Sequence, residues 1–372
     1  MTTTAAGAAG IAPAGHQAPT TEADRFRLAL AHREPDRVPV HDSPWPTTVA
    51  RWRREGLPAG VSPADYFGFG LTHVAGELDP RFPVEELNEG GDYRVWRTEY
   101  GQVRKQKRDL TSTPEIEEWP IRTREDWERV KPRLEPTADR LDLPALRRTY
   151  DAARRAGRFV TFNAHIGYAQ FLEYMRNDEL LMLLVTDPGW VHDMFATHAR
   201  LVTGLAQRMW DAGIHYDGAF LACDLGYRNA SLFSPATYRA LQFPHDRDVF
   251  DFFHGKGLPV ILHSDGCVKA LIPHFLDAGL DCLQPLEVKA GMDLLELKRE
   301  YGGRLAFMGG IDARAMADPD PAAIEREVRT KLDVARRGGG YIYHSDHSVP
   351  HDVSFDQYRH VIDLVRRYGR CA

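Results

Sequence analysis

The last two-thirds of the chain repeats one pattern, in which an apolar, strand-like run ends in polar side chains and a helical stretch follows. Strands that alternate with helices predict a parallel sheet, and about eight such strands favour a closed (β/α)8 TIM barrel over an open sheet. The carboxyl ends of all strands meet on one face of such a barrel, where these enzymes build their sites. The polar strand ends that should converge there belong to residues 159–165, 219–224, 260–265, 282–287, 307–312 and 341–347.

Helical stretches follow these runs, and a glycine stands just past the end of most of them. Glycine is common at this position because it readily adopts the left-handed conformation that ends a helix. No Gly-x-Gly-x-x-Gly motif follows any of the strands, so neither a nicotinamide nor a flavin cofactor is expected. The predicted helices are 167–176, 190–212, 235–254, 267–278, 292–301, 321–336 and 354–368.

The amino-terminal part predicts helical and hairpin elaborations of the barrel. Residues 57–120 lack a regular period, except for two strand-like runs joined at Tyr100-Gly101 that indicate a hairpin-bearing insertion or lid. Pro39 restricts the hydrogen bonding of a first short strand. The remaining predicted elements are helices at 22–32, 47–56, 124–133 and 144–156, and strands at 38–42, 93–96 and 103–107.

Length and composition favour one enzyme-sized domain over residues 21–372, because 372 residues with 43% hydrophobic content suit a decorated barrel. Residues 1–20 are rich in Ala, Gly, Thr and Pro and lack the apolar region of a signal peptide, so they predict a disordered leader. No run approaches the roughly 20 apolar residues that cross a bilayer. The net charge of −6 gives no overall positive electrostatic field that would attract nucleic acid or an anionic membrane. Four cysteines without a Cys-x-x-Cys pair favour the cytoplasm.

The sharpest local signal is a pair of ligand-capable side chains on one predicted strand. Alternation places His263 and Asp265 on the same side of that strand. A third ligand could come from the final strand, where His344, Asp346 and His347 crowd together. Two imidazoles and one carboxylate suit Zn²⁺ in a catalytic site, and they would equally suit Fe²⁺ or Mn²⁺. Alternatively, His263 and Asp265 bond each other or nearby backbone on a polar rim, and the spacing alone leaves both interpretations open.

Asp224 ends another strand and points its carboxylate toward the same face. It is a candidate general base or substrate-orienting group, while a turn cap is an equally good interpretation. Its neighbour Cys223 faces the outer layer of the barrel, where a thiol behaves as a small hydrophobe.

Further polar residues complete the predicted ring. Asn163 and His165 share one strand face and could hydrogen-bond a carboxylate or hydroxyl of a small ligand. Gln284 and Glu287 lie at the end of the predicted strand run 282–287, two strands after the one that ends at Asp224. Asp312 follows two glycines, which allow a ligand to approach the backbone, although capping the next helix is the stronger interpretation.

Several motifs together carry a resemblance to a known family. They are Arg25-Phe26-Arg27-Leu28-Ala29-Leu30, Asp36-Arg37-Val38-Pro39-Val40, Asp224-Leu225-Gly226, Ser234-Pro235-Ala236-Thr237-Tyr238, His263-Ser264-Asp265-Gly266, Gly309-Gly310-Ile311-Asp312 and His347-Ser348-Val349-Pro350-His351-Asp352-Val353. From about residue 25 to 368 the chain resembles the uroporphyrinogen decarboxylase superfamily, which also contains corrinoid and coenzyme M methyltransferases. The motifs are moderately specific for the superfamily and weak for any one reaction.

Departures from the family pattern bear on the subclass. The decarboxylases carry an arginine-rich stretch after the first strand, where this chain has Asp42-Ser43-Pro44-Trp45-Pro46. Decarboxylation of a porphyrinogen is therefore not expected. The methyltransferases hold zinc with a His-x-Cys motif and a distant Cys, and the matching positions here are His263, Asp265 and His347. Replacing both thiolates would leave a harder, more Lewis-acidic centre.

The resulting hypothesis is a metal-dependent enzyme that transfers a methyl or other group to or from a small organic substrate. His263, Asp265 and His347 would hold a divalent metal, zinc first and iron or manganese as alternatives. The alternatives are a metal-free decarboxylase and a ligand-binding barrel without catalysis. The resemblance suggests a corrinoid protein as partner and a homodimer. The other assignments are proton transfer for Asp224, His344 and Asp346, and substrate binding for Asn163, His165, Tyr227, Gln284, Glu287 and Asp312.

Overall fold

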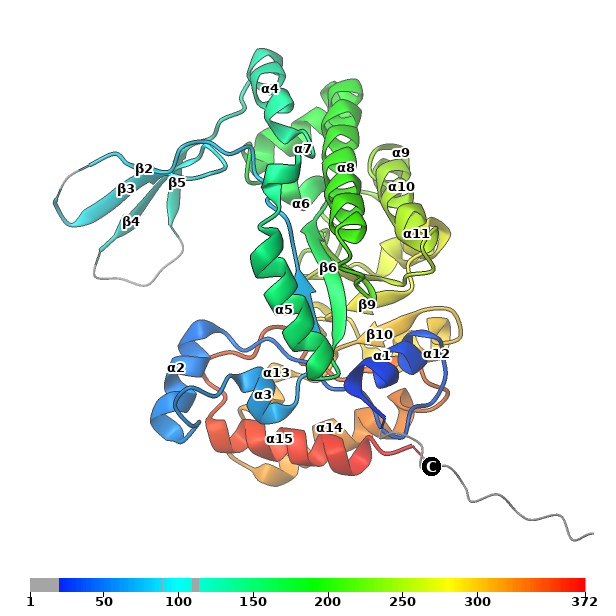
Figure 1. Cartoon of the computed structure of the whole chain (residues 1–372). Helices are drawn as coiled ribbons and strands as arrows, with labels where there is room; N and C mark the ends of the chain where they lie inside the picture. The colour runs from blue at the N-terminus through cyan, green and yellow to red at the C-terminus, as the bar shows by residue number, and fades with distance from the viewer. Residues whose placement is uncertain (1–19, 89, 109–113, 372) are drawn as a thin grey trace, which may run out of the picture.

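The computed structural model describes residues 20–88, 90–108 and 114–371. Its centre is a parallel sheet in which seven strands follow the order β1-β6-β7-β8-β9-β10-β11 (Figure 1). Every neighbouring pair runs parallel, as the alternation of strands and helices predicts. The strands are β1 (Leu71–Val74), β6 (Phe159–His165), β7 (Gly218–Ala222), β8 (Val260–His263), β9 (Cys282–Gln284), β10 (Ala306–Met308) and β11 (Tyr341–Ile342).

The extended segment around Val40 closes this sheet into a barrel. On one side, Tyr343 N donates to Pro39 O at 2.9 Å and His41 N donates to Tyr343 O at 3.1 Å. On the other side, Gly70 N donates to Val40 O at 2.7 Å, immediately before β1. The predicted first strand therefore stands between β11 and β1, although it makes only an isolated bridge because Pro39 has no N–H to donate. The predicted (β/α)8 TIM-barrel class is confirmed.

The inward-facing side chains change from apolar to polar along the barrel axis. At the amino end, α1 (Glu22–Leu30) packs against the barrel interior, and Phe26 stacks on Phe159 with ring centroids 5.4 Å apart. The strand residues of this small core are Leu71, Phe159, Ile261, Cys282, Ala306, Met308 and Ile342. Because side chains alternate along a strand, the residues that face inward further on are His73, Thr161, Asn163, His263, Gln284 and His344. The barrel is thus sealed at its amino end and polar at its carboxyl end.

The helices pack around the strands and bury the larger hydrophobic core. The predicted helix 235–254 is in fact two helices that meet at Gln242, because Pro244 cannot donate a backbone hydrogen bond in a continuous helix. The predicted helix 167–176 ends early, at Phe171, and the sequence pattern misses β1, α3 and α7. The helices are α1, α2 (Pro46–Glu55), α3 (Pro63–Phe67), α4 (Arg124–Val130), α5 (Leu143–Arg155), α6 (Gly167–Phe171), α7 (Asn177–Thr186), α8 (Pro188–Asp211), α9 (Pro235–Leu241), α10 (Phe243–His254), α11 (Ile272–Ala278), α12 (Leu294–Tyr301), α13 (Ala313–Met316), α14 (Pro321–Ala335) and α15 (Phe355–Tyr368).

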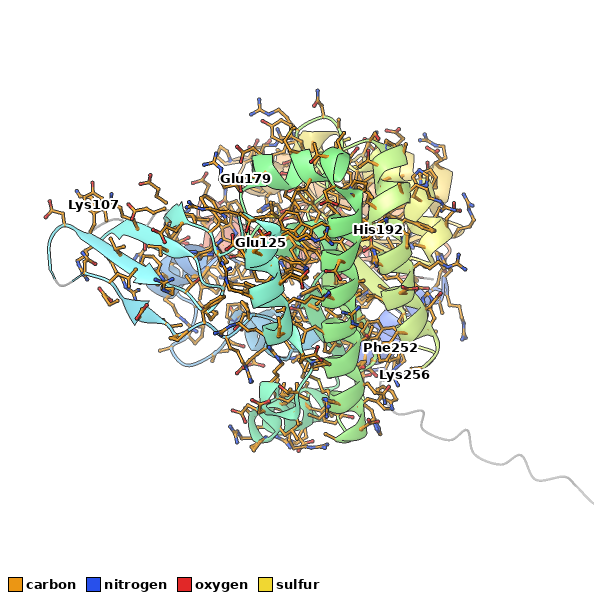
Figure 2. The ribbon with its side chains drawn as sticks, turned by 90° about the horizontal axis from the view of Figure 1, so that it is seen from above. Lys107, Glu125, Glu179, His192, Phe252 and Lys256 are labelled. Carbon is orange, nitrogen blue, oxygen red and sulfur yellow. The ribbon has the colours of Figure 1, made fainter. Side chains whose placement is uncertain are left out.

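A second, antiparallel sheet forms an arm that projects from the barrel (Figure 1). Its strands, in the order β2-β3-β4-β5, are β2 (Glu85–Glu86), β3 (Tyr93–Arg97), β4 (Val103–Lys107) and β5 (Glu115–Glu118). The predicted hairpin is its central pair. Figure 2 shows Lys107, at the end of β4, well away from the barrel body. Arg104 ties the base of the arm to Glu173 at 2.7 Å. None of its described residues lines the pocket at the barrel mouth, so the arm is an insertion rather than a lid.

The leader predicted over residues 1–20 lies outside the described residues, apart from Thr20. Among the described helices, none is both long enough and apolar enough to span a membrane. All four cysteines are free thiols.

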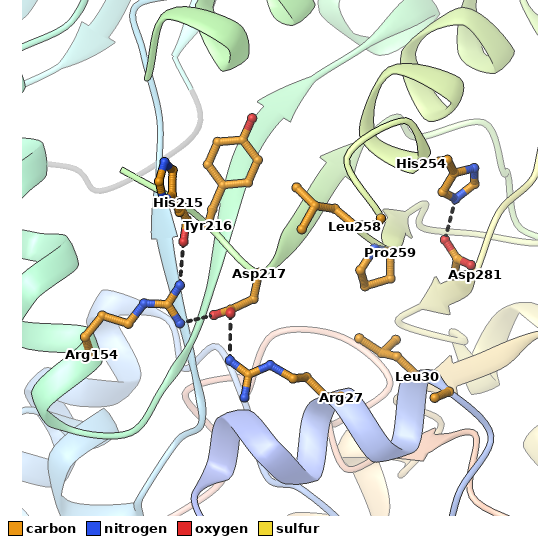
Figure 3. A pocket seen from close by; sticks show the side chains of 12 residues that line it. Arg27, Leu30, Arg154, His215, Tyr216, Asp217, His254, Leu258, Pro259 and Asp281 are labelled. Carbon is orange, nitrogen blue, oxygen red and sulfur yellow. Dashed lines mark hydrogen bonds and ion pairs between the residues drawn. The ribbon is translucent and has the colours of Figure 1, made fainter. Parts of the chain in front are cut away.

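At the amino end of the barrel, a carboxylate joins α1 to the barrel wall. Asp217 accepts hydrogen bonds from Arg27 at 2.8 Å and from Arg154 at 2.6 Å (Figure 3). It also accepts a hydrogen bond from Val160 N at 2.8 Å. The cavity beside it, also lined by Leu258, lies at the amino end of the barrel, where TIM barrels use residues for stability.

Replacing Asp217 with asparagine is expected to lower the free energy of unfolding by about 1–2 kcal/mol, because two guanidinium groups lose their shared negative charge while remaining partly solvated. Asp277→Asn is the matched control, since its pair with Arg239 is 3.3 Å long and exposed on both sides. It should change stability by less than about 0.5 kcal/mol. Urea denaturation of both variants measures the difference, and equal losses would contradict the anchoring role of Asp217.

Candidate active site

A pocket of about 270 Å³ opens at the carboxyl ends of the barrel strands. It contains eight of the twelve site residues that the sequence predicts, which shows that residues distant in sequence converge as expected. Its lining residues are Ser43, His73, Asn163, His165, Phe220, Ala222, Cys223, Asp224, His263, Asp265, Gln284, Pro285, His344, His347 and Ser348.

Two imidazoles and two carboxylates meet on one side of this pocket. His263 Nε2 lies 3.5 Å from Asp224 Oδ1 and 3.7 Å from Asp265 Oδ2. His347 Nε2 lies 3.2 Å from Asp265 Oδ2. Tetrahedral ligands bound at Zn²⁺ distances lie about 3.4 Å from one another. Asp224, His263 and Asp265 offer ligand atoms that all lie within 4.8 Å of one another, so Asp224 joins two of the predicted ligands. The third predicted ligand, His347, contacts Asp265 but is not part of this closely spaced group.

Gln284 sets the orientation of the His263 ring. His263 Nδ1 lies 2.5 Å from Gln284 Oε1, and because a carbonyl oxygen can only accept, Nδ1 is the donor. A neutral His263 would then direct the lone pair of Nε2 at Asp224 and Asp265. Fixing the tautomer through the second ring nitrogen is how proteins commonly orient metal-ligating histidines. Gln284, which the sequence predicts to bind substrate, therefore also positions the His263 ring.

The charges of this cluster favour a cation between the carboxylates. Burial raises the pKa of Asp265, but its contacts with His263 and His347 outweigh burial and lower the pKa overall. Burial lowers the pKa of His263, yet the two carboxylates raise it overall, and the contact with Asp265 raises the pKa of His347. Asp265 Oδ1 is buried without a hydrogen-bond partner in the described structure. An unpartnered carboxylate oxygen in this position fits a bound cation.

Two glycines bring Asp224 and Asp265 together. The loops after β7 and β8 cross at Gly226 and Gly266, where a Cβ atom on Gly266 would lie 2.4 Å from the Gly226 carbonyl carbon. Asp265 N donates to Asp224 Oδ1 at 3.1 Å across this crossing. Side chains at either glycine would hold the loops apart, so the close backbone approach positions the two carboxylates.

On the opposite side of the pocket, the polar groups form no ion pair with this cluster. Asn163 Nδ2 donates to Phe220 O at 3.2 Å, which leaves its carbonyl oxygen available. His344 is 2% exposed, and its Nδ1 donates to Ser345 O at 2.7 Å. Its Nε2 is therefore an acceptor in the neutral ring and lies 3.4 Å from Ser43 Oγ.

His165 lies at the end of β6 on the same inward face as Asn163. Burial lowers the pKa of His165, and the nearby Asp224 only partly offsets this effect. The ring is therefore a neutral hydrogen-bonding group above its lowered pKa.

Four predicted site residues lie outside the pocket. Tyr227 and Glu287 line a neighbouring cleft of about 540 Å³, which shares only Asp265 with the pocket. Asp312 caps α13, as the stronger interpretation of this residue predicts, and accepts from Arg314 N at 2.9 Å.

Asp346 is buried and holds two loops together, since its oxygens accept from Ala313 N at 2.9 Å and Val288 N at 3.0 Å. Its predicted catalytic role is therefore not supported by its position, because neither oxygen is available to the pocket.

The sequence pattern misses His73, Ser43 and Phe220 as pocket residues. His73 lies in β1, whose four residues are too few to show a clear period. The alternation of inward-facing residues along β7 would have placed Phe220 on the inner face. Cys223 also borders the pocket, but it is fully buried, and burial raises the pKa of its thiol far above the ordinary range.

The ionisable side chains that line the pocket are mainly those of acids and histidines. None of the described lining residues is an arginine or lysine. The pocket therefore lacks the guanidinium groups that hold carboxylates in two-point contacts.

A sequence profile described as uroporphyrinogen decarboxylase (URO-D) matches residues 106–368, which is more than half of the chain. The protein belongs to the uroporphyrinogen decarboxylase family. Among curated members, the enzyme of Cupriavidus necator is 27% identical over 202 residues, which cover 49% of each chain. That of Edwardsiella ictaluri is 32% identical over 113 residues, or 30% of each chain. This family member thus spans about half or less of the length of the curated relatives it matches.

A solved structure of a methyltransferase from Methanosarcina mazei has the same fold as this family member. The two superimpose with a TM-score of 0.64 at 16% sequence identity, covering 94% of this chain and 99% of the other. The likeness extends over nearly the whole barrel and its elaborations.

Proposed function

We propose that this family member is a metal-dependent enzyme that transfers a methyl or other group to or from a small organic substrate. The observation that carries the proposal is the approach of His263 and His347 to Asp265 Oδ2, while the other oxygen of the same carboxylate, Oδ1, is buried without a hydrogen-bond partner in the described structure. The similarly folded protein from Methanosarcina mazei is a methyltransferase, which supports the transfer chemistry. A pocket of about 270 Å³ suits a small ligand.

The donor set favours zinc, with iron or manganese as alternatives, since imidazole and carboxylate ligands suit all three. His263, Asp265 and His347 would hold the ion, which would act as a Lewis acid toward a bound substrate atom. Gln284 keeps the His263 ring in place through its Nδ1 hydrogen. Side chains of this kind commonly raise metal affinity by 10- to 100-fold, on the order of 1–3 kcal/mol.

Group transfer also needs proton acceptors and donors near the reacting atoms. When the group passes as a cation between two oxygen, nitrogen or sulfur atoms, the acceptor atom loses a proton as it gains the group, while the leaving atom keeps the bonding pair and gains a proton. With a corrinoid as one party, only the substrate atom would exchange a proton. Asp224 has a side chain 54% exposed, so it can accept the first proton and exchange it with solvent. His344 Nε2, an acceptor that faces the pocket, is the second group proposed to handle protons. A corrinoid protein is the proposed partner that supplies or receives the group.

Elemental analysis of the untagged protein tests the metal centre. We expect about one equivalent of zinc, iron or manganese in the native protein and almost none in His263→Ala, because the ion loses its ring ligand. His215→Ala, at the opposite end of the barrel, is the control and should retain the metal. Stoichiometric metal in His263→Ala would overturn the ligand assignment. Absence of metal from both proteins would overturn the metal-dependent function.

Family membership favours a second candidate, decarboxylation without a metal. Asp224 or Asp265 would then stabilise a protonated intermediate. The absence of arginine and lysine from the described pocket lining argues against a substrate with many carboxylates. Turnover by metal-free protein, measured as released carbon dioxide, would select this candidate.

A further inference from the structure

The side of the pocket opposite the acidic cluster is a wall of imidazole, amide and hydroxyl groups. Three neighbouring extended segments of the barrel build it: the segment around Val40, β1 and β6. His344, which follows β11, completes it. His41 and His344 have ring centroids 6.0 Å apart, and His41 and His73 have centroids 6.2 Å apart. We name His73, His344, Asn163 and Ser43, which line the pocket here, the neutral wall.

His73 is the central member of this wall. Its Nδ1 lies 2.8 Å from Thr161 Oγ1, and its ring meets Phe220 edge-on at 4.9 Å. These contacts fix the ring and leave Nε2 toward the pocket, because the surface of His73 that remains open belongs to the pocket lining. Burial lowers the pKa of His73 to about 4, so the ring is neutral at physiological pH.

A second histidine stands behind the wall. His41 is buried, and its Nδ1 has no hydrogen-bond partner in the described structure. Burial, followed by the nearness of His344 and His73, lowers the pKa of His41 far below its ordinary range. This environment penalises a positive charge on His41 and His73, and none of the described lining residues is an arginine or lysine.

Apolar surface lies between the neutral wall and the acidic cluster. Phe220 faces His73 at 4.9 Å and His263 at 6.3 Å between ring centroids, and Pro285 and Ala222 also line the pocket. A ligand that reaches both sides would therefore place a compact apolar body against Phe220.

We infer that the neutral wall is a binding subsite for an uncharged oxygen function, such as a hydroxyl, ether or carbonyl group, on a small and largely apolar substrate. Neutral imidazole, amide and hydroxyl groups offer both donors and acceptors to such an oxygen. A carboxylate or phosphate would lose its hydration there without gaining a cationic partner. This subsite would define the substrate class of the pocket to which the proposed function is assigned. Only the statement that the bound molecule is a substrate rests on that proposed function.

Three probes with similar rings and different charges test the subsite, namely phenol, benzoate and benzylammonium. Their dissociation constants are measured by saturation-transfer difference NMR on the native protein and on the metal-poor His263→Ala variant. Phenol should bind at least tenfold more tightly than benzoate in both proteins. Tighter binding of benzoate, or of benzylammonium drawn to the acidic cluster, would overturn the inference.

Variants of His73 locate the interaction. His73→Leu removes the ring nitrogen and should weaken phenol binding about fivefold, the effect of one neutral hydrogen bond. His73→Gln retains donor and acceptor groups and should recover at least half of the affinity. His215→Leu, at the other end of the barrel, is the matched control and should bind phenol as the native protein does. Asn163→Leu provides a second test on β6 if His73→Leu does not fold.

Equal phenol affinity in native protein, His73→Leu and Asn163→Leu would overturn the subsite. Phenol binding that disappears in His263→Ala would also overturn it, because the probe would then be coordinated to the metal rather than held by the wall. A protein without metal that still shows the phenol preference and its dependence on His73 would retain the subsite while the metal-dependent function fails. The two proposals therefore fail separately.

Discussion

Replacing Gly266 with alanine is expected to destabilise the protein by more than 3 kcal/mol, because two separate costs combine at this position. Gly266 has a φ of +79°, in the left-handed region, where a residue with a Cβ atom loses roughly 1–2 kcal/mol. The added Cβ would also lie 2.4 Å from the Gly226 carbonyl carbon. Since the contacting atoms belong to the backbone, the two loops must separate, and Asp224 must move away from Asp265.

Gly291→Ala separates the two costs. Gly291 has a φ of +84°, but no atom lies within 4 Å of its added Cβ, so only the conformational cost applies. Thermal and urea denaturation should therefore show a loss of roughly 1–2 kcal/mol for Gly291→Ala and a clearly larger one for Gly266→Ala. Metal content should fall only in the Gly266 variant. Similar stability losses in the two variants would show that the loop crossing tolerates a side chain.

Replacing Asp246 with asparagine is expected to make the stability of the protein less dependent on pH. Asp246 is buried behind β7, where its carboxylate accepts from Tyr238 at 2.8 Å and from Gln242 at 3.1 Å. Burial raises the pKa of Asp246 to about 7, against roughly 3.9 in an unfolded chain. The folded state therefore binds this proton more tightly than the unfolded state does.

The sign of the effect follows from linkage. The contribution of Asp246 to stability is fully present below about pH 4 and is lost progressively as the pH rises to about 7. Between pH 5 and pH 8 the native protein should lose about 2–3 kcal/mol relative to Asp246→Asn, whose amide stays neutral. Denaturant unfolding at several pH values measures this difference. Asp248→Asn, at an exposed position on the same helix, is the control. If the stability difference between the native protein and Asp246→Asn were the same at pH 5 and at pH 8, the raised pKa of Asp246 would be contradicted.

Local sequence patterns are sufficient to predict most of the barrel. Strand-like runs such as 159–165 are apolar over enough residues to be recognised, and the helices that follow them end near glycines. The pattern fails where an element is short or where proline interrupts it. The strand β1 has only four residues, and Pro39 removes a ladder hydrogen bond from the segment that closes the barrel.

The candidate site is predictable for residues that share a strand, because alternation alone places them on one face. His263 and Gln284 face inward from neighbouring strands for this reason, and they contact each other. Asp346 and Asp312 end strands of the same kind, yet their carboxylates hold loop backbone and a helix end instead. Beyond the strand end, the course of each loop decides where a side chain points, and that course depends on contacts with other loops.

The sequence by itself determined the parallel barrel and the face on which its polar strand ends meet, since both follow from local periodicity and from the rules of strand connection. Only the tertiary structure decided which of those polar groups share one pocket. The crossing of Gly226 over Gly266, the ring of His263 held by Gln284, and the histidines of the neutral wall all depend on packing between segments distant in sequence. Such contacts are set by the shapes and hydrogen bonds of several loops at once, and no local pattern encodes them.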